Sequence, residues 1–260
     1  MRERTRRNVL CSIAGAAALA GCSESTSTGG ELFENVTVDN TELVVKLADD
    51  TSGNIAITNP DGELFAEADR TSGETQLTFE LGVDYTPGEY EIALVESGER
   101  SATTSLDIHP NLEIVDIGIG ENHPDRMPDS LGKTADVECF VELRNTGTGP
   151  TAIQQLEFSG DVPNPTALHN SESGIFDDTT GQGERDRIIL NPDSADTIFS
   201  STLPFSFEGE GTDCKEERQE GECLITITGT NYPNIEQQFL VEYPSADEYD
   251  ACRPEIIERG

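Results

Sequence analysis

The sequence has 260 residues, of which 51 are Asp or Glu and only 16 are Lys or Arg, so its formal net charge is −35. Phosphate backbones are bound mainly by Lys and Arg, so a chain without a basic stripe is not expected to bind nucleic acid. The carboxylates are spread through every segment instead of being gathered in one tail. This dispersal favours adaptation to a salty solvent over a local binding patch.

The first 21 residues have the layout of an export signal that is removed from the mature protein. Four arginines within the first seven residues precede an apolar, small-residue stretch at 9–20, which is typical of a signal peptide. This stretch is too short to cross a bilayer as a helix, which takes about 20 residues. The pair Arg6 and Arg7, between Thr5 and a hydrophobic pair, resembles a twin-arginine export signal.

The signal ends in a sequence that predicts a lipid anchor. Residues 19–22 read Leu-Ala-Gly-Cys, which resembles a lipobox, where cleavage before the cysteine lets its thiol carry a lipid. The alternative is an ordinary signal with an incidental cysteine. Cleavage would make Cys22 the first residue, and residues 22–30, rich in Ser, Thr and Gly, would form a flexible tether. We therefore expect the protein on the outer face of the cell membrane.

Signal, lipobox, tether and acidic body in this order resemble the twin-arginine-exported surface lipoproteins of salt-loving archaea. Removing residues 1–21 takes away four arginines and one glutamate, which brings the net charge to −38. Such charge repels itself in a compact state, but the Debye length falls from about 8 Å at 0.15 M salt to about 3 Å at 1 M. Molar salt is therefore expected to remove most of the strain.

The body begins with a predicted β-sandwich at 31–109. Short segments alternate between apolar and polar residues and are separated by turn residues, as in immunoglobulin-like domains. The predicted strands are 32–38, 42–47, 54–58, 63–68, 75–81, 89–95 and 103–108. Residues 85–92, Tyr-Thr-Pro-Gly-Glu-Tyr-Glu-Ile, resemble the turn and late strand of many bacterial and archaeal immunoglobulin-like domains.

A second β-sandwich is predicted at 110–245, which makes the fold class all-β with two tandem immunoglobulin-like sandwiches. Its predicted strands are 112–119, 135–144, 152–158, 185–190, 197–207, 222–229 and 235–243. Residues 141–149 resemble the strand and turn of adhesion-type (CARDB-like) sandwich domains of archaeal surface proteins, and 190–198 resemble the turn and strand that follow. Asp193 replaces the glycine usual in that second motif.

Two segments of the second unit do not fit the strand pattern. Residues 159–184 form a loop longer than most connections in compact domains, which indicates either a functional or a mobile segment. The tail at 246–260 could form a short helix, but Pro254 and the missing apolar stripe argue against it.

The mature body keeps four cysteines, and an even number outside the cell predicts disulfides. They are Cys139, Cys214, Cys223 and Cys252. All four fall near one end of the predicted sandwich, which leaves three pairings open. The parity of Cys139 and Cys223 along their strands points both thiols inward, which would allow a bridge between the sheets. We favour 214–223 with 139–252, because Cys214 and Cys223 flank one polar loop. A zinc site of all four is the alternative, but the short paired spacing of zinc sites is absent.

No catalytic or cofactor motif is recognised in the sequence. The histidines are His109, His123 and His169, and none belongs to an HExxH or comparable pattern. A blue-copper centre is excluded because no cysteine has His or Met within the next ten residues. His123 with Asp125 and Asp129 could form a metal or acid–base cluster, although an exposed loop histidine is commoner. We expect no metal and no cofactor.

Only Asn35, in Asn-Val-Thr, satisfies the N-glycosylation sequon. The sequence leaves open whether Asn35 is glycosylated or is an unmodified strand residue.

These observations lead to three functional hypotheses. The first is a non-enzymatic surface lipoprotein, held at the membrane through Cys22, that binds a protein or glycan of the cell envelope or supports its structure. The second is an extracellular enzyme or accessory subunit with a site near His123 and the 159–184 loop. The third, the substrate-binding component of a transporter, is less favoured because such receptors are larger α/β proteins.

Overall fold

The computed structural model describes residues 32–48, 52–70, 73–166, 168, 172–207, 219–243 and 253–257. The predictions that concern the signal peptide with Arg6 and Arg7, the lipidated Cys22 and the tether therefore lie outside the described residues. Cys214, Cys252 and His169 also lie outside them.

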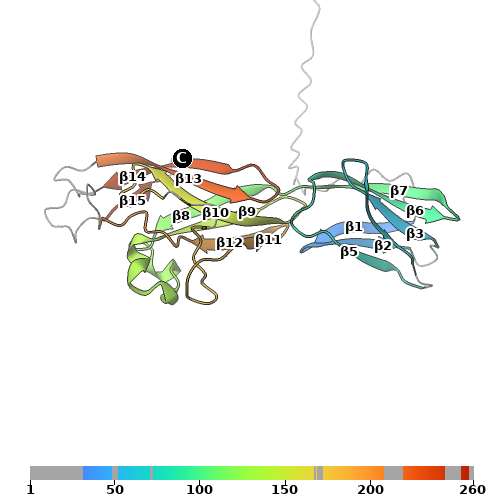
Figure 1. Ribbon diagram of the computed structural model, residues 1–260, viewed down its shortest axis with the longest axis horizontal. Helices are drawn as coiled ribbons and strands as arrows, with labels where there is room; N and C mark the ends of the chain where they lie inside the picture. Colours follow the sequence, from blue (N-terminus) through green and yellow to red (C-terminus); the bar gives the residue numbers. More distant parts are fainter. Residues whose placement is uncertain are drawn as a thin grey trace, which may run out of the picture.

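The first half of the body is a pair of antiparallel sheets (Figure 1). Its strands are β1 (Phe33–Asp39), β2 (Glu42–Leu47), β3 (Asn54–Thr58), β4 (Leu64–Ala68), β5 (Gln76–Glu80), β6 (Gly88–Glu96) and β7 (Glu99–Ile108). One sheet has the order β1-β2-β5 and the other β4-β3-β6-β7. Sequential strands thus divide between two sheets, as they do in a sandwich.

The second half repeats this strand order. Its strands are β8 (Leu112–Ile119), β9 (Cys139–Asn145), β10 (Thr151–Gly160), β11 (Ile188–Leu190), β12 (Ser194–Phe199), β13 (Gln219–Gly229), β14 (Ile235–Tyr243) and β15 (Glu255–Ile257). The sheets are β12-β9-β8 and β11-β10-β13-β14-β15. Numbered within each half, both sandwiches have the first, second and fifth strands in one sheet and the fourth, third, sixth and seventh in the other.

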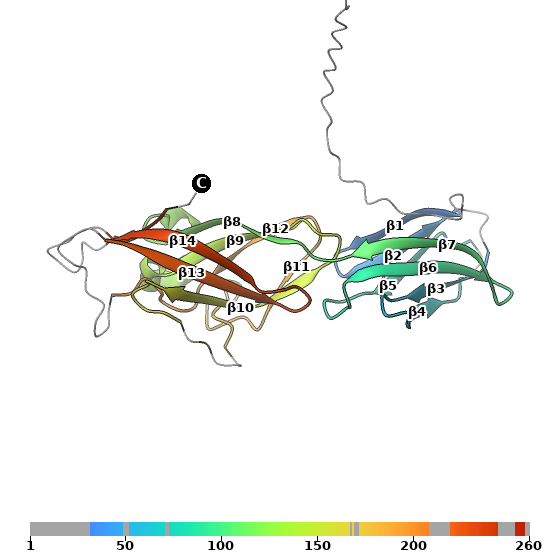
Figure 2. The same cartoon turned by 90° about the horizontal axis from the view of Figure 1, so that it is seen from above.

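This repeated arrangement is an immunoglobulin-like β-sandwich topology, and it confirms the predicted all-β fold class. Among the described residues the helical segments are the 3₁₀ helices η1 (Pro124–Arg126) and η2 (Asp129–Val137). The two sandwiches lie end to end (Figures 1 and 2). That each is an independent domain with the predicted boundaries stays a prediction.

Alternation of apolar and polar residues explains why these segments form strands. In β5 the side chains of Leu77 and Phe79 are buried, while those of Gln76, Thr78 and Glu80 are exposed. Successive side chains of a strand point to opposite faces, so this order buries one face of the sheet. The same alternation recurs in β3.

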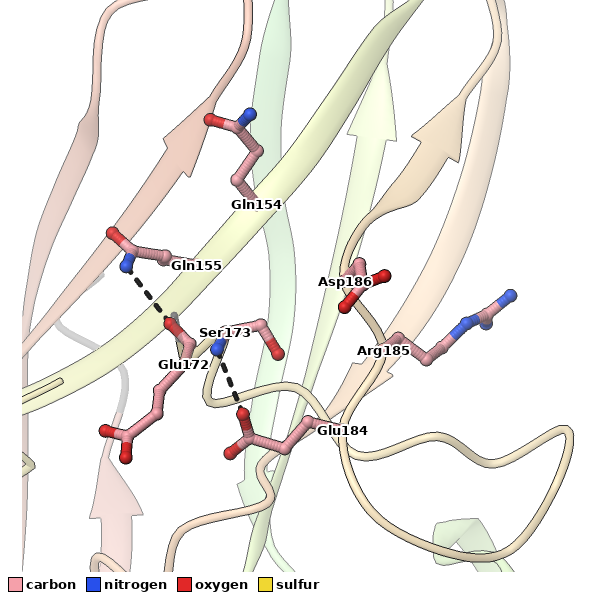
Figure 3. Close-up of a pocket in the computed structure, with 7 residues that line it drawn as sticks. All are labelled: Gln154, Gln155, Glu172, Ser173, Glu184, Arg185 and Asp186. Carbon is pink, nitrogen blue, oxygen red and sulfur yellow. Dashed lines mark hydrogen bonds between the residues drawn. The ribbon is translucent and has the colours of Figure 1, made fainter. Parts of the chain in front are cut away.

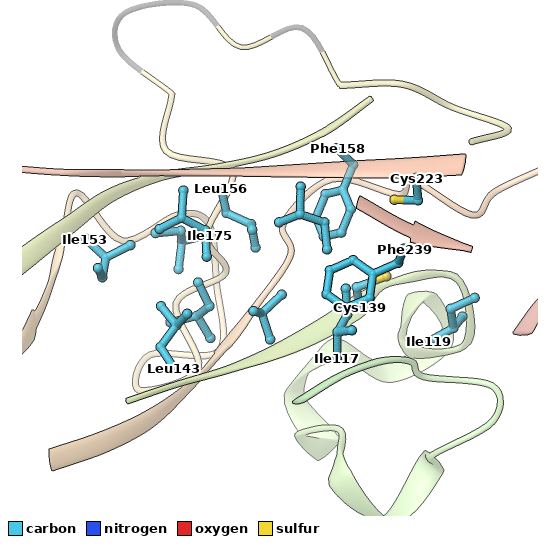
Figure 4. Close-up of a cluster of buried hydrophobic side chains, with 14 of the residues drawn as sticks. Ile117, Ile119, Cys139, Leu143, Ile153, Leu156, Phe158, Ile175, Cys223 and Phe239 are labelled. Carbon is cyan, nitrogen blue, oxygen red and sulfur yellow. The ribbon is translucent and has the colours of Figure 1, made fainter. Parts of the chain in front are cut away.

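Each sandwich has its own hydrophobic core. The first core contains Leu43, Ile55, Phe79, Tyr90 and Ile92 among others. The second is formed by residues such as Val141, Leu156, Phe158, Ile225 and Phe239, and part of it is drawn in Figure 4. Side chains from both sheets interdigitate in each core, as expected for stacked sheets about 10 Å apart.

The structure corrects three of the predicted segments. Residues 135–137 belong to η2, and the strand begins only at Cys139. Strand β12 ends at Phe199 instead of continuing to 207, and Phe205 is buried in a turn. The tail forms no helix in its described part: Glu255–Ile257 pair with β14 as β15, because Ile256 can pack against the second core.

Candidate binding cleft on the second sandwich

A polar cleft of about 460 Å³ lies along β10 of the second sandwich (Figure 3). Its lining residues come from β10 and from two stretches of the long connection between β10 and β11. They are Gln154, Gln155, Glu172, Ser173, Glu184, Arg185 and Asp186. The cleft therefore involves the predicted 159–184 loop and the two residues that follow it.

The cleft forms where the partner strand of β10 ends. Strand β11 pairs only with Thr151–Ile153 of β10. Beyond this point the returning connection takes its place, and the backbone N–H of Leu156 donates to the carbonyl of Ser173 at 2.8 Å. A bulge between Ile153 and Gln155, where β10 pairs with β13, locally shifts the side chains of β10.

The carboxylate of Glu184 holds the two sides of the connection together. Its Oε2 accepts a hydrogen bond from the backbone N–H of Ser173 at 3.0 Å, and its Oε1 accepts one from the Ser201 hydroxyl at 2.5 Å. Backbone bridges link Ile175 with Ser200 and Phe176 with Glu184. Residues 172–187 are thus tied to the sandwich by hydrogen bonds.

The tip of the connection is a turn organised by Asp177. Hydrogen bonds from Thr179 and Thr180 lower the pKa of its carboxyl to about 2, so it stays charged. The guanidinium of Arg185 lies 3.2 Å from Asp178. Asp177 and Asp178, which together with Glu184 could have suggested a weak cation site, are thus engaged in local contacts.

The cleft offers hydrogen-bonding groups of both kinds and is negatively charged. Carboxylates come from Glu172, Glu184 and Asp186, whereas Arg185 supplies the single cation of the lining. The side-chain amide of Gln155 donates to the carbonyl of Glu172 at 3.1 Å, which leaves its amide oxygen directed elsewhere. None of the lining residues is aromatic. The lining therefore suits neutral or cationic polar ligands over anionic or apolar ones.

His123 does not belong to this cleft. Its ring packs edge-on against Phe140, with the ring centroids 5.5 Å apart. Arg126 lies over the same Phe140 ring at 3.8 Å and pairs with Asp116 and with Glu142, the latter at 2.9 Å. Since η1 and η2 cover the outer face of the sheet β12-β9-β8, the predicted His123 region serves to pack this covering segment.

The structure does not support the alternative of a metal cluster at His123, Asp125 and Asp129. Within the described ranges no three His, Cys, Asp or Glu side chains converge in a group suited to a metal ion. His123, Asp125 and Asp129 are all exposed. His109 is also exposed and lies 3.3 Å from Asp107.

Cys139 and Cys223 face the same core from opposite sheets. Cys139 lies at the start of β9 and Cys223 in β13, and both side chains are 0 % exposed. Figure 4 shows both sulfur atoms directed into the space between the sheets. Both are free thiols in this structure. Because the two thiols face one core and interact there, a 139–223 bridge is a further prediction. The pairing suggested by the sequence involves Cys214 and Cys252, which lie outside the described residues.

Asn35 lies on the edge strand β1 and its side chain is exposed, so the sequon is accessible. Its glycosylation stays a prediction. As for membrane insertion, the described part of the chain contains no helix long and apolar enough to span a bilayer.

Sequence reasoning missed Gln154 and Gln155. The available signal was the polar pair itself, which interrupts the apolar–polar alternation of 152–158. Such an interruption is typical of a bulge, and bulges often lie next to functional sites. Ser173 and Asp186 could not be assigned, because the path of the long connection is set by contacts with Ser200 and Ser201.

No protein-family model matches the sequence, and no curated protein matches it. Among solved structures, the chain is similar to the BSP domain of a biofilm-associated protein, with 13 % identity and a TM-score of 0.23 over 85 % of this chain and 31 % of that one. It is similar to the human OSCAR ligand-binding domain, with 11 % identity and a TM-score of 0.22 over 82 % of this chain and 93 % of that one.

A glycosyl hydrolase family 2 member from Bacteroides cellulosilyticus DSM 14838 is also similar, with 11 % identity and a TM-score of 0.24 over 77 % of this chain. This chain spans only 24 % of that protein. At these TM-scores the likenesses carry no functional argument, and the fold assignment rests on the strand order.

Proposed function

We propose that this chain is a lipid-anchored protein of the outer cell surface that binds a neutral, hydroxyl-rich glycan of the cell envelope in the cleft along β10. The observation that carries the proposal is the lining of this cleft, in which amides and carboxylates stand together without an apolar platform. Sugar hydroxyls donate to carboxylates and accept from amides and guanidinium groups. Protein partners, in contrast, are usually held by buried aromatic and arginine anchors.

The charge of the cleft limits which glycans can bind there. Three carboxylates against one guanidinium give the lining a net negative charge, and the whole chain is strongly acidic. Uronic acids, sulfated sugars and phosphorylated sugars would be repelled, especially at low salt where screening is weak. Neutral and amino sugars remain as ligands.

The position of the cleft agrees with an anchor at Cys22. Strand β1 begins at Phe33 and runs toward Asn40, whose side chain contacts Asn191 of the second sandwich at 3.0 Å. The chain therefore enters the first sandwich at the end remote from the second. A lipid attached ten residues before residue 32 would hold that end, and the cleft would lie on the other sandwich.

The binding test uses the mature chain with Cys22→Ser, in molar salt, and isothermal titration with neutral, amino and uronic acid oligosaccharides. We expect neutral or amino sugars to bind and Gln154→Ala with Gln155→Ala to weaken binding about tenfold or more, since each lost hydrogen bond is worth about 1 kcal/mol. Gln237→Ala, on the exposed face of β14, is the matched control and should bind normally.

Two results would count against the proposal. Binding of uronic acids that exceeds that of neutral sugars, and does not weaken as the salt is lowered, would contradict the electrostatic argument. Release of reducing ends during the titration would favour the enzyme hypothesis, and His123→Ala would then show whether that activity depends on the predicted histidine.

A further inference from the structure

The motif Asn145-Thr146-Gly147-Thr148-Gly149, noted in the sequence for its family likeness, lies at the junction between the sandwiches and not at the cleft. Asn145 ends β9 and is fully buried. Its Oδ1 accepts from the backbone N–H groups of Asn111 and Gly147, both at 3.0 Å. Its Nδ2 donates to the carbonyls of Gly149 at 2.8 Å and Leu190 at 3.2 Å. One side chain thus fixes the linker between the sandwiches to the second sandwich.

The two glycines of the motif are required because neighbouring atoms lie too close to leave room for a Cβ. Neither has a positive φ, so the turn itself does not demand glycine. A Cβ at Gly147 would lie 2.3 Å from the carbonyl oxygen of His109 in the linker. A Cβ at Gly149 would lie 2.0 Å from the phenol oxygen of Tyr85 in the first sandwich. A Cβ at either position would therefore force a shift at the junction, in the linker backbone or in the Tyr85 side chain.

Further hydrogen bonds cross the junction, both from this motif and from other turns of the second sandwich. The hydroxyl of Thr230 donates to the carbonyl of Val83 at 3.1 Å, and that of Thr148 donates to the carbonyl of Asp107 at 2.7 Å. A third bond joins the side chains of Asn191 and Asn40. Contacts from three separate turns restrain rotation about the linker as well as bending.

The junction also concentrates buried polar atoms that lack a good hydrogen bond to protein. Of the four buried side-chain atoms among the described residues that make no hydrogen bond of good geometry, three flank this seam: Tyr85 Oη, which interacts only weakly with Asn231, Thr151 Oγ1 and Asn191 Oδ1. Burial raises the pKa of the Tyr85 phenol, so it remains a hydrogen-bond donor. Buried polar atoms are nearly always hydrogen-bonded to protein or to ordered water, and a water molecule needs two to four such partners. The seam therefore has the chemistry of a site for bridging water.

We propose that the Asn145–Gly149 motif and this polar seam lock the two sandwiches into one rigid rod. The linker His109–Asn111 is then a fixed joint and not a hinge. This inference does not depend on the glycan proposed for the cleft.

Residual dipolar couplings of the mature chain with Cys22→Ser, aligned in a stretched gel, test the lock directly. In the wild-type body one alignment tensor should describe the amides of both sandwiches. Gly149→Ala should give two different tensors, because the added methyl group separates Tyr85 from the turn. Circular dichroism would confirm that the variant retains its strands.

Thr230→Val keeps the test decisive if Gly149→Ala fails to fold. Removing its hydroxyl breaks the hydrogen bond to Val83 while keeping the shape of the side chain. The alignment tensors of the two sandwiches should then differ. Thr226→Val, on the preceding strand β13 but remote from the junction, should behave as wild type. Two different tensors in the wild-type protein, or one shared tensor in both Gly149→Ala and Thr230→Val, would overturn the proposal.

Discussion

At the scale of single residues, the pair Cys139 and Cys223 has the clearest chemical consequence. Both thiols are fully buried between the sheets. Burial raises the pKa of Cys139, to which the nearby Cys223 contributes, and raises that of Cys223 to about 12. A buried thiol with a raised pKa is a poor nucleophile. A bridge between them must therefore form during folding, before the core closes.

We predict a Cys139–Cys223 disulfide in the exported protein. Two thiols lose two protons and two electrons to a disulfide-exchanging oxidant, and the S–S bond closes a loop of roughly 85 residues, worth about 4.5 kcal/mol of stability in the chain-entropy description. Peptide mapping without reduction should find the two peptides linked, and Cys139→Ala should lower the melting temperature.

The alternative disulfide pairing would give a different set of linked peptides. Peptides that join Cys214 with Cys223 and Cys139 with Cys252 would contradict the prediction and restore the pairing suggested by the sequence. If reduced, folded protein formed the bridge rapidly on addition of oxidant, the argument from burial would be wrong.

At the scale of elements, the segment with η1 and η2 acts as a cover on the outer face of the sheet β12-β9-β8. It buries Met127 and Leu131 against Phe140 and Phe199. Glu138 lies at the end of this segment and is only 3 % exposed, with Oε2 lacking a partner. Burial raises the pKa of its carboxyl to about 7, and a hydrogen bond with Thr134 partly opposes this.

The buried carboxyl predicts that the cover is less stable at alkaline pH. Between pH 4.5, the ordinary pKa, and about 7, the folded state binds more protons than the unfolded state, so stability falls as pH rises through this window. Glu138→Gln should remove this dependence and stabilise the protein at pH 8 by up to about 3 kcal/mol. Urea unfolding at pH 5 and pH 8 measures the difference.

Glu113→Gln, at an exposed position of β8, is the matched control and should leave the pH dependence unchanged. Equal pH dependence in Glu138→Gln and the parent protein would show that Glu138 is not the titrating group.

At the scale of the whole molecule, the net negative charge has the largest expected effect on stability. The described ion pairs, such as Arg100–Glu91 and Arg253–Glu121, engage only a few of the carboxylates. Exposed pairs of this kind contribute about 0–1 kcal/mol each. The remaining repulsion is reduced when mobile ions screen it or when the chain unfolds and its charges separate.

We therefore predict that the melting temperature rises steeply from about 0.1 M to about 3 M salt, with sodium and potassium chloride acting alike. In low salt, lowering the pH to about 5 should also help, because repelled carboxyls have raised pKa values in the folded state. Burial raises the pKa of Glu121 in the same direction. A melting temperature that stays constant across this range of salt concentration would mean that specific ion pairs or bound ions neutralise the carboxylates.

The sequence by itself determined the local structure of the body. Alternation in segments such as 42–47, 54–58, 112–119 and 235–243 placed these strands at their observed bounds, because period-two patterning is a property of each segment alone. The inward parity of Cys139 and Cys223 was also readable, since side chains alternate across a strand.

Only the tertiary structure decided which distant residues meet. It separated His123 from the cleft, brought Ser173 to Glu184, added β15 to the sheet and placed Gly149 against Tyr85. These contacts depend on the path of the 120–138 and 161–187 connections and on the packing of one sandwich against the other. Such paths are set by contacts between segments far apart in the chain, and no periodicity within one segment encodes them.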